Sequence, residues 1–327
     1  MNALVTGASG FTGSHLTRHL VATGWHVRAL TRPGADLRPL ADLGVEHARL
    51  DLADDRPADD VMAGIDVVFH VAALYRTEGV PRRRFWQVNV GGTRKLLEAA
   101  TRAGVRRFVH VSTVGVQGHI RRPPATEEAP FGPGDHYQES KRDAEVLARE
   151  HFARTGLAGV VIRPTAIYGP GDTRLLKLFR LIDRGRFLML GRGDRLYHMV
   201  YVDDLVSGLA LAGVHPGAAG QVFTIGGAEY VTLNDLVRRI SAVLGRPVPR
   251  MRVPVAPVRA MGLLCEVACR PLRIDPPIYR RRVDFFTKDR AFDIRKARRL
   301  LGYEPKVSLD EGLARAAAWY RARGWLR

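Results

Sequence analysis

The residues with the clearest capacity for chemistry are Tyr137 and Lys141, which stand four positions apart. The apolar spacing of residues 143–151 predicts a helix, and Asp135 is a suitable residue to begin it. Residues four apart lie on one face of a helix, so the phenol and the ammonium should lie side by side. A neighbouring cation favours the phenolate, so we expect Lys141 to lower the pKa of Tyr137. Such a tyrosine can take a proton from an alcohol or give one to a ketone. The pair also fits a solvated helix face, so the surrounding elements must decide.

The chain begins with a glycine-rich turn between a predicted strand and a predicted helix. Residues 2–6 are apolar and residues 15–22 have helical periodicity, with three glycines between them. In such a unit the glycines permit a tight turn, a close approach of the backbone to a pyrophosphate, and close packing of helix on strand. The helix N-terminus then faces the phosphates. This context predicts a dinucleotide site, to which we assign Gly7, Ser9, Gly10, Phe11 and Gly13.

The predicted second strand, residues 25–31, is followed by Arg32 rather than by an acid. An acid at this position usually holds the ribose 2′-hydroxyl of NAD, whereas an arginine suits the 2′-phosphate of NADP. We therefore favour NADP over NAD as the cofactor, although Arg32 could also point into water.

Strands and helices alternate through the first half of the chain. Further strands are predicted at 45–50, 67–70, 107–111 and 159–162, and a long helix at 86–103. This order predicts an α/β fold with a doubly wound parallel sheet of the Rossmann type, in which ligands bind beyond the carboxyl ends of the strands. The other candidate cofactor contacts follow these strand ends or lie on the long helix: Arg32, Asp51, Leu52, Val71, Ala72, Ala73, Asn89, Pro164 and Ile167.

The second half of the chain has a less regular order. Helices are predicted at 175–184, 203–212, 232–244, 291–301 and 309–323, and a strand at 222–225 that returns to the sheet. We therefore expect a dinucleotide-binding domain at 1–168, joined again by residues 199–226, and a smaller C-terminal α+β substrate domain at 169–327. The apolar segment 253–270 could be a lid, an interface helix or a helix in peripheral contact with a membrane.

Composition argues against several classes of protein. The net charge of +18 over 327 residues could indicate nucleic acid, an anionic membrane or acidic ligands. The arginines are spread along the chain, however, and aromatic residues are not interleaved with basic clusters, so we expect no nucleic-acid partner. Cys265 and Cys269 form neither a metal-ligand framework nor a redox pair, so we expect no metal and a cytoplasmic protein. We also expect no signal peptide and no transmembrane segment.

Several motifs occur together and in a fixed order. The motifs are Thr6-Gly7-x-x-Gly10-x-x-Gly13, Thr113, Tyr137-x-x-x-Lys141 and Arg163-Pro164-x-x-Ile167-Tyr168-Gly169-Pro170. Together with residues 297–305 near the end of the chain, they resemble the extended short-chain dehydrogenase/reductases, the NAD-dependent epimerase/dehydratase family, along essentially the whole sequence. The resemblance also implies a homodimer that pairs through helices 86–103 and 137–151.

The resemblance implies roles for individual residues. Tyr137 would be the general acid/base, and Lys141 would bind the nicotinamide ribose while lowering the tyrosine pKa. Thr113 would hydrogen-bond the substrate oxygen, with Ser112 as a competing assignment, and Asn89 resembles the family's structural asparagine near the site. The implied chemistry is hydride transfer between a secondary carbon and C4 of the nicotinamide, with Tyr137 moving the proton.

Departures from the family pattern bear on the small-molecule substrate. Val114 and Gly115 stand where sugar dehydratases have acids, which disfavours dehydration. Ala166 and Tyr197 stand where nucleotide-sugar enzymes often have Asn and Arg, which weakens that assignment. The candidate substrate contacts are Tyr75, Ser112, Gln117, Ala166, Arg195 and His198.

Three functions stay open at this point. The first is a reductase or dehydrogenase of an apolar alcohol or ketone, similar to 3β-hydroxysteroid dehydrogenases. The second is a nucleotide-sugar epimerase that keeps a tightly bound NAD. The third is a non-enzymatic nucleotide sensor, and the intact set of Thr113, Tyr137 and Lys141 argues against it.

Overall fold

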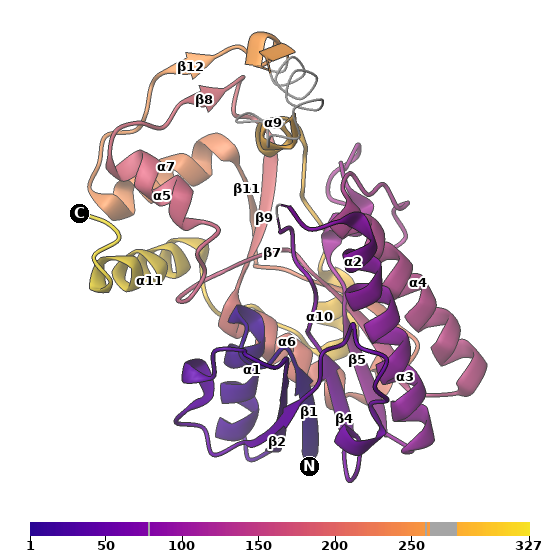
Figure 1. Ribbon diagram of the computed structural model, residues 1–327. Coiled ribbons are helices and arrows are strands. Elements are labelled where there is room, and N and C mark those ends of the chain that lie inside the picture. Colours follow the sequence, from indigo (N-terminus) through magenta and orange to yellow (C-terminus); the bar gives the residue numbers. More distant parts are fainter. Residues whose placement is uncertain (78, 259, 262–279) are drawn as a thin grey trace.

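The computed structural model describes residues 1–77, 79–258, 260–261 and 280–327. Its centre is a seven-stranded parallel sheet with the order β10-β6-β5-β4-β1-β2-β3 (Figure 1). The strands are β1 (Asn2–Thr6), β2 (His26–Thr31), β3 (Glu46–Arg49), β4 (Val67–His70), β5 (Arg107–Val111), β6 (Gly159–Pro164) and β10 (Val222–Ile225). The predicted strands and the doubly wound α/β fold are therefore confirmed, including the return of residues 222–225 beside β6.

Helices cover both faces of this sheet. On one face α1 (Phe11–Ala22), α6 (Val202–Val214) and α10 (Arg295–Leu301) bury Leu16, Leu205 and Leu301 in one apolar cluster with the strands. On the other face α3 (Gly92–Arg102) and α4 (His136–Thr155) bury Leu96 and Phe152 against the sheet. Because the central strands are buried on both faces, their sequences read as continuous apolar runs.

The predicted helix 86–103 is longer and less regular than expected. It begins with α2 (Arg82–Trp86), passes through a π-helical turn at Gln87–Gly91 and continues as α3. The sequence did not predict the helical turn that begins at Arg82, because three successive arginines show no apolar periodicity and Pro81, with φ −64°, precedes the turn. The π turn contains Asn89, and such turns are frequent at functional sites.

A second unit lies above the carboxyl ends of the sheet strands in Figure 1. Its centre is β9 (Leu196–Tyr201), paired with β7 (Ala166–Tyr168) and β11 (Tyr230–Thr232). Helices α5 (Leu176–Asp183), α7 (Leu233–Leu244) and α11 (Leu309–Ala322) pack around it in a separate apolar cluster. Two short strands, β8 (Met189–Leu190) and β12 (Arg252–Val253), and α9 (Arg280–Thr287) complete the described part. The sequence did not predict β9, because Tyr197, His198 and Tyr201 interrupt the apolar residues and the pattern does not alternate regularly.

Other predictions about the second half have mixed outcomes. Helices 175–184, 203–212, 232–244 and 309–323 are confirmed as α5, α6, α7 and α11. Helix 291–301 was predicted too long, because α10 begins at Arg295, whose backbone N–H bonds to the Asp293 carboxylate in a turn. Most of segment 253–270, with Cys265 and Cys269, lies outside the described residues, and the domain boundary at residue 168 stays a prediction.

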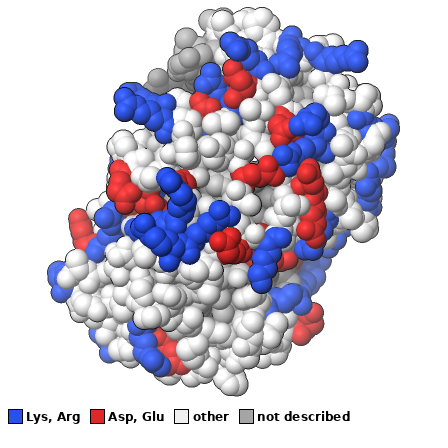
Figure 2. Space-filling view, turned by 180° about the vertical axis from the view of Figure 1, so that it is seen from behind, with Lys and Arg blue, Asp and Glu red and all other residues white. Residues whose placement is uncertain are grey.

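The surface charge is dispersed over the face shown in Figure 2, where acidic side chains interrupt the basic ones. Among the residues that the structure describes, no helix is long and apolar enough to cross a membrane. The same residues contain no cluster of His, Cys, Asp and Glu suited to a metal ion.

Candidate active site

The glycine turn between β1 and α1 forms the floor of the site. Gly7 has φ +67°, and a Cβ there would come within 2.9 Å of the Ala72 backbone after β4. A Cβ at Gly13 would overlap the carbonyl oxygen of Gly7. Gly10 precedes α1 and has no side chain to cap the helix, so the first amides of α1 stay open to a ligand. These residues fit the pyrophosphate of a dinucleotide, which a helix N-terminus and a close backbone approach both favour.

The predicted contacts around this turn lie at the carboxyl edge of the sheet. Ala72 donates its N–H to the Thr6 hydroxyl at 3.0 Å and lies directly against Gly7, with Val71 and Ala73 on either side. Ser9 is half-buried in the turn itself. Pro164 ends β6, and Ile167 follows on β7.

The predicted adenosine contacts lie at the ends of β2 and β3. Arg32 is exposed directly after β2. Asp51 follows β3, accepts the N–H of Ala53 and pairs with Arg84 at 3.2 Å. Leu52 is buried and packs closely on Gly92 at the start of α3. An exposed guanidinium and a partly open carboxylate therefore stand where an adenosine ribose and base would be expected.

Both polar atoms of the Asn89 side chain form hydrogen bonds within the protein. Its amide exchanges two hydrogen bonds with the backbone of Leu74 and donates a third to the Ser140 hydroxyl at 2.9 Å. It therefore ties the loop after β4 to helix α4, which is a structural role rather than a cofactor contact.

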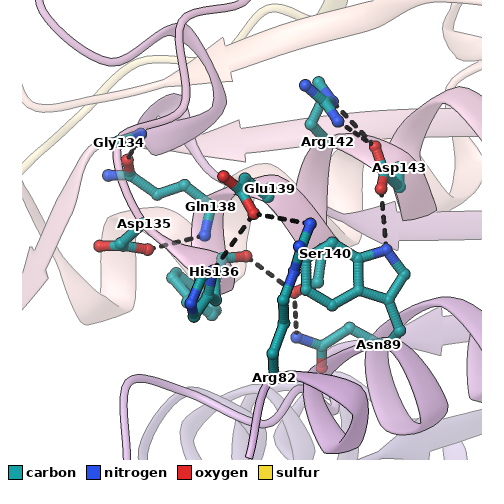
Figure 3. A network of polar contacts seen from close by, with 12 residues as sticks. Arg82, Asn89, Gly134, Asp135, His136, Gln138, Glu139, Ser140, Arg142 and Asp143 are labelled. Atoms are coloured by element: carbon teal, nitrogen blue, oxygen red, sulfur yellow. Dashed lines mark hydrogen bonds and ion pairs between the residues drawn. The ribbon is translucent and has the colours of Figure 1, made fainter.

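The start of α4 is fixed by several polar contacts, shown in Figure 3. Asp135 caps the helix by accepting the Gln138 N–H at 2.8 Å, and Arg82 of α2 pairs with Glu139. Trp86 donates its indole N–H to Asp143 at 2.9 Å. Helix α4 runs over 20 residues from His136, which confirms the predicted start at Asp135. It extends beyond the predicted end at residue 151, because Gly156 provides the C-terminal signal.

Tyr137 lies on the first turn of α4, half-buried among aromatic and basic groups. Its ring meets the Tyr75 ring edge-to-face at 4.9 Å, and the Arg76 guanidinium lies 5.5 Å from its centre. Burial raises the pKa of Tyr137, as does Tyr75, and the cations Arg76 and Arg174 only partly offset this. The prediction that Lys141 lowers this pKa is wrong for the protein without ligands.

Lys141 is buried one turn further along α4. Its ammonium donates to the Val111 carbonyl at the end of β5, at 2.7 Å. Burial lowers the pKa of Lys141 to about 8, against the raising effect of Glu145. Its charge is therefore directed at the end of β5, which explains why it does not lower the pKa of the Tyr137 phenol.

The two hydroxyls after β5 have different surroundings. Ser112 is buried and donates to the Glu145 carboxylate at 2.6 Å, within a network that also holds Arg163. Thr113 is only half-buried, and its oxygen accepts the Gly115 N–H at 3.1 Å, which leaves its O–H to donate elsewhere. The geometry favours Thr113 as the hydroxyl that faces a substrate.

The other predicted substrate contacts are divided. Gln117 is buried and donates to the carbonyls of Thr126 and Ala129, and His198 is buried against the Gly227 carbonyl, so neither side chain is open to a substrate. Arg195 pairs with Asp289 at 2.8 Å, which holds it beside the segment after α9. Tyr75 and Ala166 are exposed at the carboxyl edge.

Two site residues were missed by sequence reasoning. Arg174, in the loop after β7, lies 5.4 Å from the Phe11 ring and 5.7 Å from the Tyr75 ring. Arg76, in the loop after β4, lies between Tyr75 and Tyr137. A continuous line of contacts therefore joins the glycine turn to Tyr137. The only available signal was the position of each arginine shortly after a strand end.

The sequence matches the model of the NAD dependent epimerase/dehydratase family over residues 3–226. Among curated proteins, it is 32% identical to sterol demethylase protein B of Methylococcus capsulatus, with 100% of each chain covered. It is 31% identical to the 2-alkyl-3-oxoalkanoate reductase of Stenotrophomonas maltophilia, over 97% of this chain and 99% of the other. Among solved structures, gox2253 superposes with a TM-score of 0.86 at 30% identity, with 99% of each chain covered.

Proposed function

The chain belongs to the NAD-dependent epimerase/dehydratase family and is an NAD(P)-dependent oxidoreductase or epimerase of the extended short-chain type, and we propose that it transfers hydride reversibly at a secondary alcohol or ketone. The observation that carries the proposal is the convergence of Tyr137, Thr113 and the glycine turn at one edge of the sheet. A nicotinamide cofactor bound on that turn supplies or accepts hydride at C4 of its ring.

The protein's own residues manage the proton and the orientation. The phenol of Tyr137 is protonated at neutral pH, as an ordinary tyrosine is, and it therefore carries the proton that a carbonyl oxygen would accept. The free O–H of Thr113 would hydrogen-bond the same oxygen and polarise it. Lys141 would hold the nicotinamide ribose from beneath, because its ammonium already lies at the end of β5.

Two observations support an apolar alcohol or ketone as the substrate. Two relatives carry a sterol and a 2-alkyl-3-oxoalkanoate in their names, and both are largely apolar molecules. Arg195, one of the candidate substrate contacts, is already paired with Asp289 and is therefore less available to a nucleotide diphosphate. Nucleotide-sugar epimerisation, which the family description also allows, is therefore the second candidate.

We propose NADP rather than NAD on the basis of Arg32, which is exposed at the end of β2 where an acid would hold the 2′-hydroxyl of NAD. We also propose a cytoplasmic homodimer paired through α2–α3 and α4, on the family resemblance described above. Size-exclusion chromatography with light scattering would test the dimer.

The test of function uses Tyr137→Phe, which removes the phenolic proton and keeps the ring. With NADPH and a panel of apolar ketones, wild-type protein should consume cofactor at 340 nm, and the variant should lose about 10²–10⁴-fold in kcat. Cofactor affinity should not change. Equal turnover by both proteins would contradict the proposal. NAD retained through purification, with sugar interconversion and no net cofactor consumption, would favour the epimerase.

A further inference from the structure

Two arginines from different loops lie beside the aromatic rings of the candidate site. The Arg76 guanidinium lies 5.5 Å from the centre of the Tyr137 ring, and the guanidinium groups of Arg76 and Arg174 both lie 5.7 Å from the centre of the Tyr75 ring. Arg76 is 28% exposed and Arg174 is 41% exposed, so each can reach a ligand at the carboxyl edge.

Each guanidinium is positioned by a carboxylate that is itself anchored to the backbone. Arg76 donates from Nε to Asp135, which also caps α4, and Arg174 donates from Nε to Asp172, which also accepts the N–H of Leu175. The terminal nitrogens are less engaged among the described residues, because Arg76 makes one long contact to the Tyr75 hydroxyl and Arg174 one bond to the Ile167 carbonyl. An arginine has five N–H donors, so this arrangement leaves donors for an anion.

We propose that Arg76 and Arg174 bind a carboxylate of the substrate, and that the substrate is therefore a 3-hydroxy or 3-oxo acid. This inference rests on the proposed function and specifies its substrate. Hydride leaves or joins the carbon that carries the hydroxyl or oxo group, Tyr137 takes or gives the proton, and the carboxylate is unchanged.

The distances define where the carboxylate stands. A charge-assisted hydrogen bond to a guanidinium spans about 2.7–2.9 Å, and the reacting oxygen must lie about 2.6–3.2 Å from the Tyr137 hydroxyl. Because Arg76 packs on the Tyr137 ring, the two oxygen functions of the substrate must be only a few bonds apart. A 3-hydroxy acid meets this condition. The diphosphate of a nucleotide sugar does not, because the hexose ring separates it from the reacting hydroxyl.

The test compares acids with neutral partners of the same shape. Wild-type enzyme with NADP⁺ or NAD⁺ is given 3-hydroxyalkanoates of several chain lengths and their methyl esters, and UDP-glucuronate against UDP-glucose. We expect the acids to exceed their neutral partners in kcat/KM by about 10-fold or more, as charged hydrogen bonds allow. A preference for the 3-hydroxyalkanoate over its ester would identify an alkanoate as the substrate, and a preference for UDP-glucuronate over UDP-glucose would identify a uronate.

The variants are Arg76→Gln and Arg174→Gln, with Arg142→Gln as a matched control because that arginine lies on α4, is 36% exposed and pairs with Asp143. The two test variants should raise KM for the acid and lower its kcat/KM about 10–100-fold, and the ester should lose much less. Arg76→Lys should restore part of the preference, which separates charge from damage to the start of α4. Cofactor affinity should be unaffected in every variant.

The proposal would be overturned by equal use of acid and ester by wild-type enzyme, by equal loss of both in the variants, or by weaker cofactor binding in Arg174→Gln with the acid preference intact. The last would assign Arg174 to the cofactor pyrophosphate. Hydride transfer to neutral ketones but to no acid would refute the proposed binding of a substrate carboxylate and leave the proposed function standing. No hydride transfer to any compound would refute the proposed function.

Discussion

At the scale of single residues, the phenol of Tyr137 is controlled by its surroundings more than by its helical neighbour. Lys141 is four residues away but directs its ammonium to the Val111 carbonyl. Tyr75, Arg76 and burial set the protonation of Tyr137 instead. The phenol of the free protein is therefore protonated, which is the form that carbonyl reduction requires, although its raised pKa makes it a weaker acid than an ordinary tyrosine.

The neighbouring hydroxyls give a residue-scale prediction. Thr113→Val should lower kcat about 10–100-fold, because the substrate oxygen loses one hydrogen-bond donor, while Thr113→Ser should retain most activity. Steady-state kinetics at saturating cofactor measure both. Ser112→Ala is the matched comparison, since its hydroxyl serves Glu145, and it should lower the melting temperature more than kcat. A larger loss of kcat in Ser112→Ala than in Thr113→Val would reverse the assignment.

At the scale of elements, a buried ion pair joins α4 to the sheet. Arg163 of β6 and Glu145 of α4 are 2% and 0% exposed and lie 2.6 Å apart. Arg163 also donates to the Glu127 carbonyl, and Glu127 accepts the Thr224 N–H of β10. The helix that carries Tyr137 and Lys141 is thus tied to β6 and, through Arg163 and Glu127, to β10.

Neutralising this pair should destabilise the fold. Glu145→Gln leaves the Arg163 charge without its carboxylate in the interior, and we expect a loss of about 3–5 kcal/mol in the free energy of unfolding. Urea denaturation followed by circular dichroism measures it. Glu150→Gln, exposed on the same helix, should change stability little. Similar values for the two variants would show that the buried pair contributes no net stability.

The element scale also explains what the sequence could predict. The glycine turn and the sheet strands were predictable because turn chemistry and continuous apolar runs are local signals. Strand β9 was not, because its tyrosines and His198 leave neither a continuous apolar run nor a regular alternation. Arg76 was not, because its partner Asp135 is 59 residues away, and only the folded chain brings them together.

At the scale of the whole molecule, the chain crosses repeatedly between its two units. After β7 and α5 it returns through α6 and β10 to the sheet, and α10 packs on the sheet face after α9. The candidate site lies where the loops of both units meet, so that residues such as Phe11, Tyr75 and Arg174 come together from distant parts of the sequence.

Buried histidines predict how global stability depends on pH. Burial lowers the pKa of His70 to about 3 and lowers that of His110 well below its usual range, with a further effect of Lys141 on both. Below about pH 6.5 these histidines bind protons in the unfolded chain but not in the folded protein. The free energy of unfolding should therefore fall by about 1.4 kcal/mol for each histidine and each unit by which the pH is lowered. Denaturation between pH 7 and pH 5 measures the slope.

His110→Leu should remove one histidine's share of that slope, because neither ring nitrogen of His110 has a hydrogen-bond partner among the described residues. An unchanged slope in His110→Leu would show that this histidine does not couple folding to pH.

Hydride transfer itself is tested most directly by isotope transfer. Wild-type enzyme is given NADPH carrying deuterium at both C4 positions, together with the ketone or 3-oxo acid that it turns over best. The account predicts one deuterium on the carbinol carbon of the product by mass spectrometry, and its loss in Tyr137→Phe. A product formed at the normal rate without the label would contradict the account.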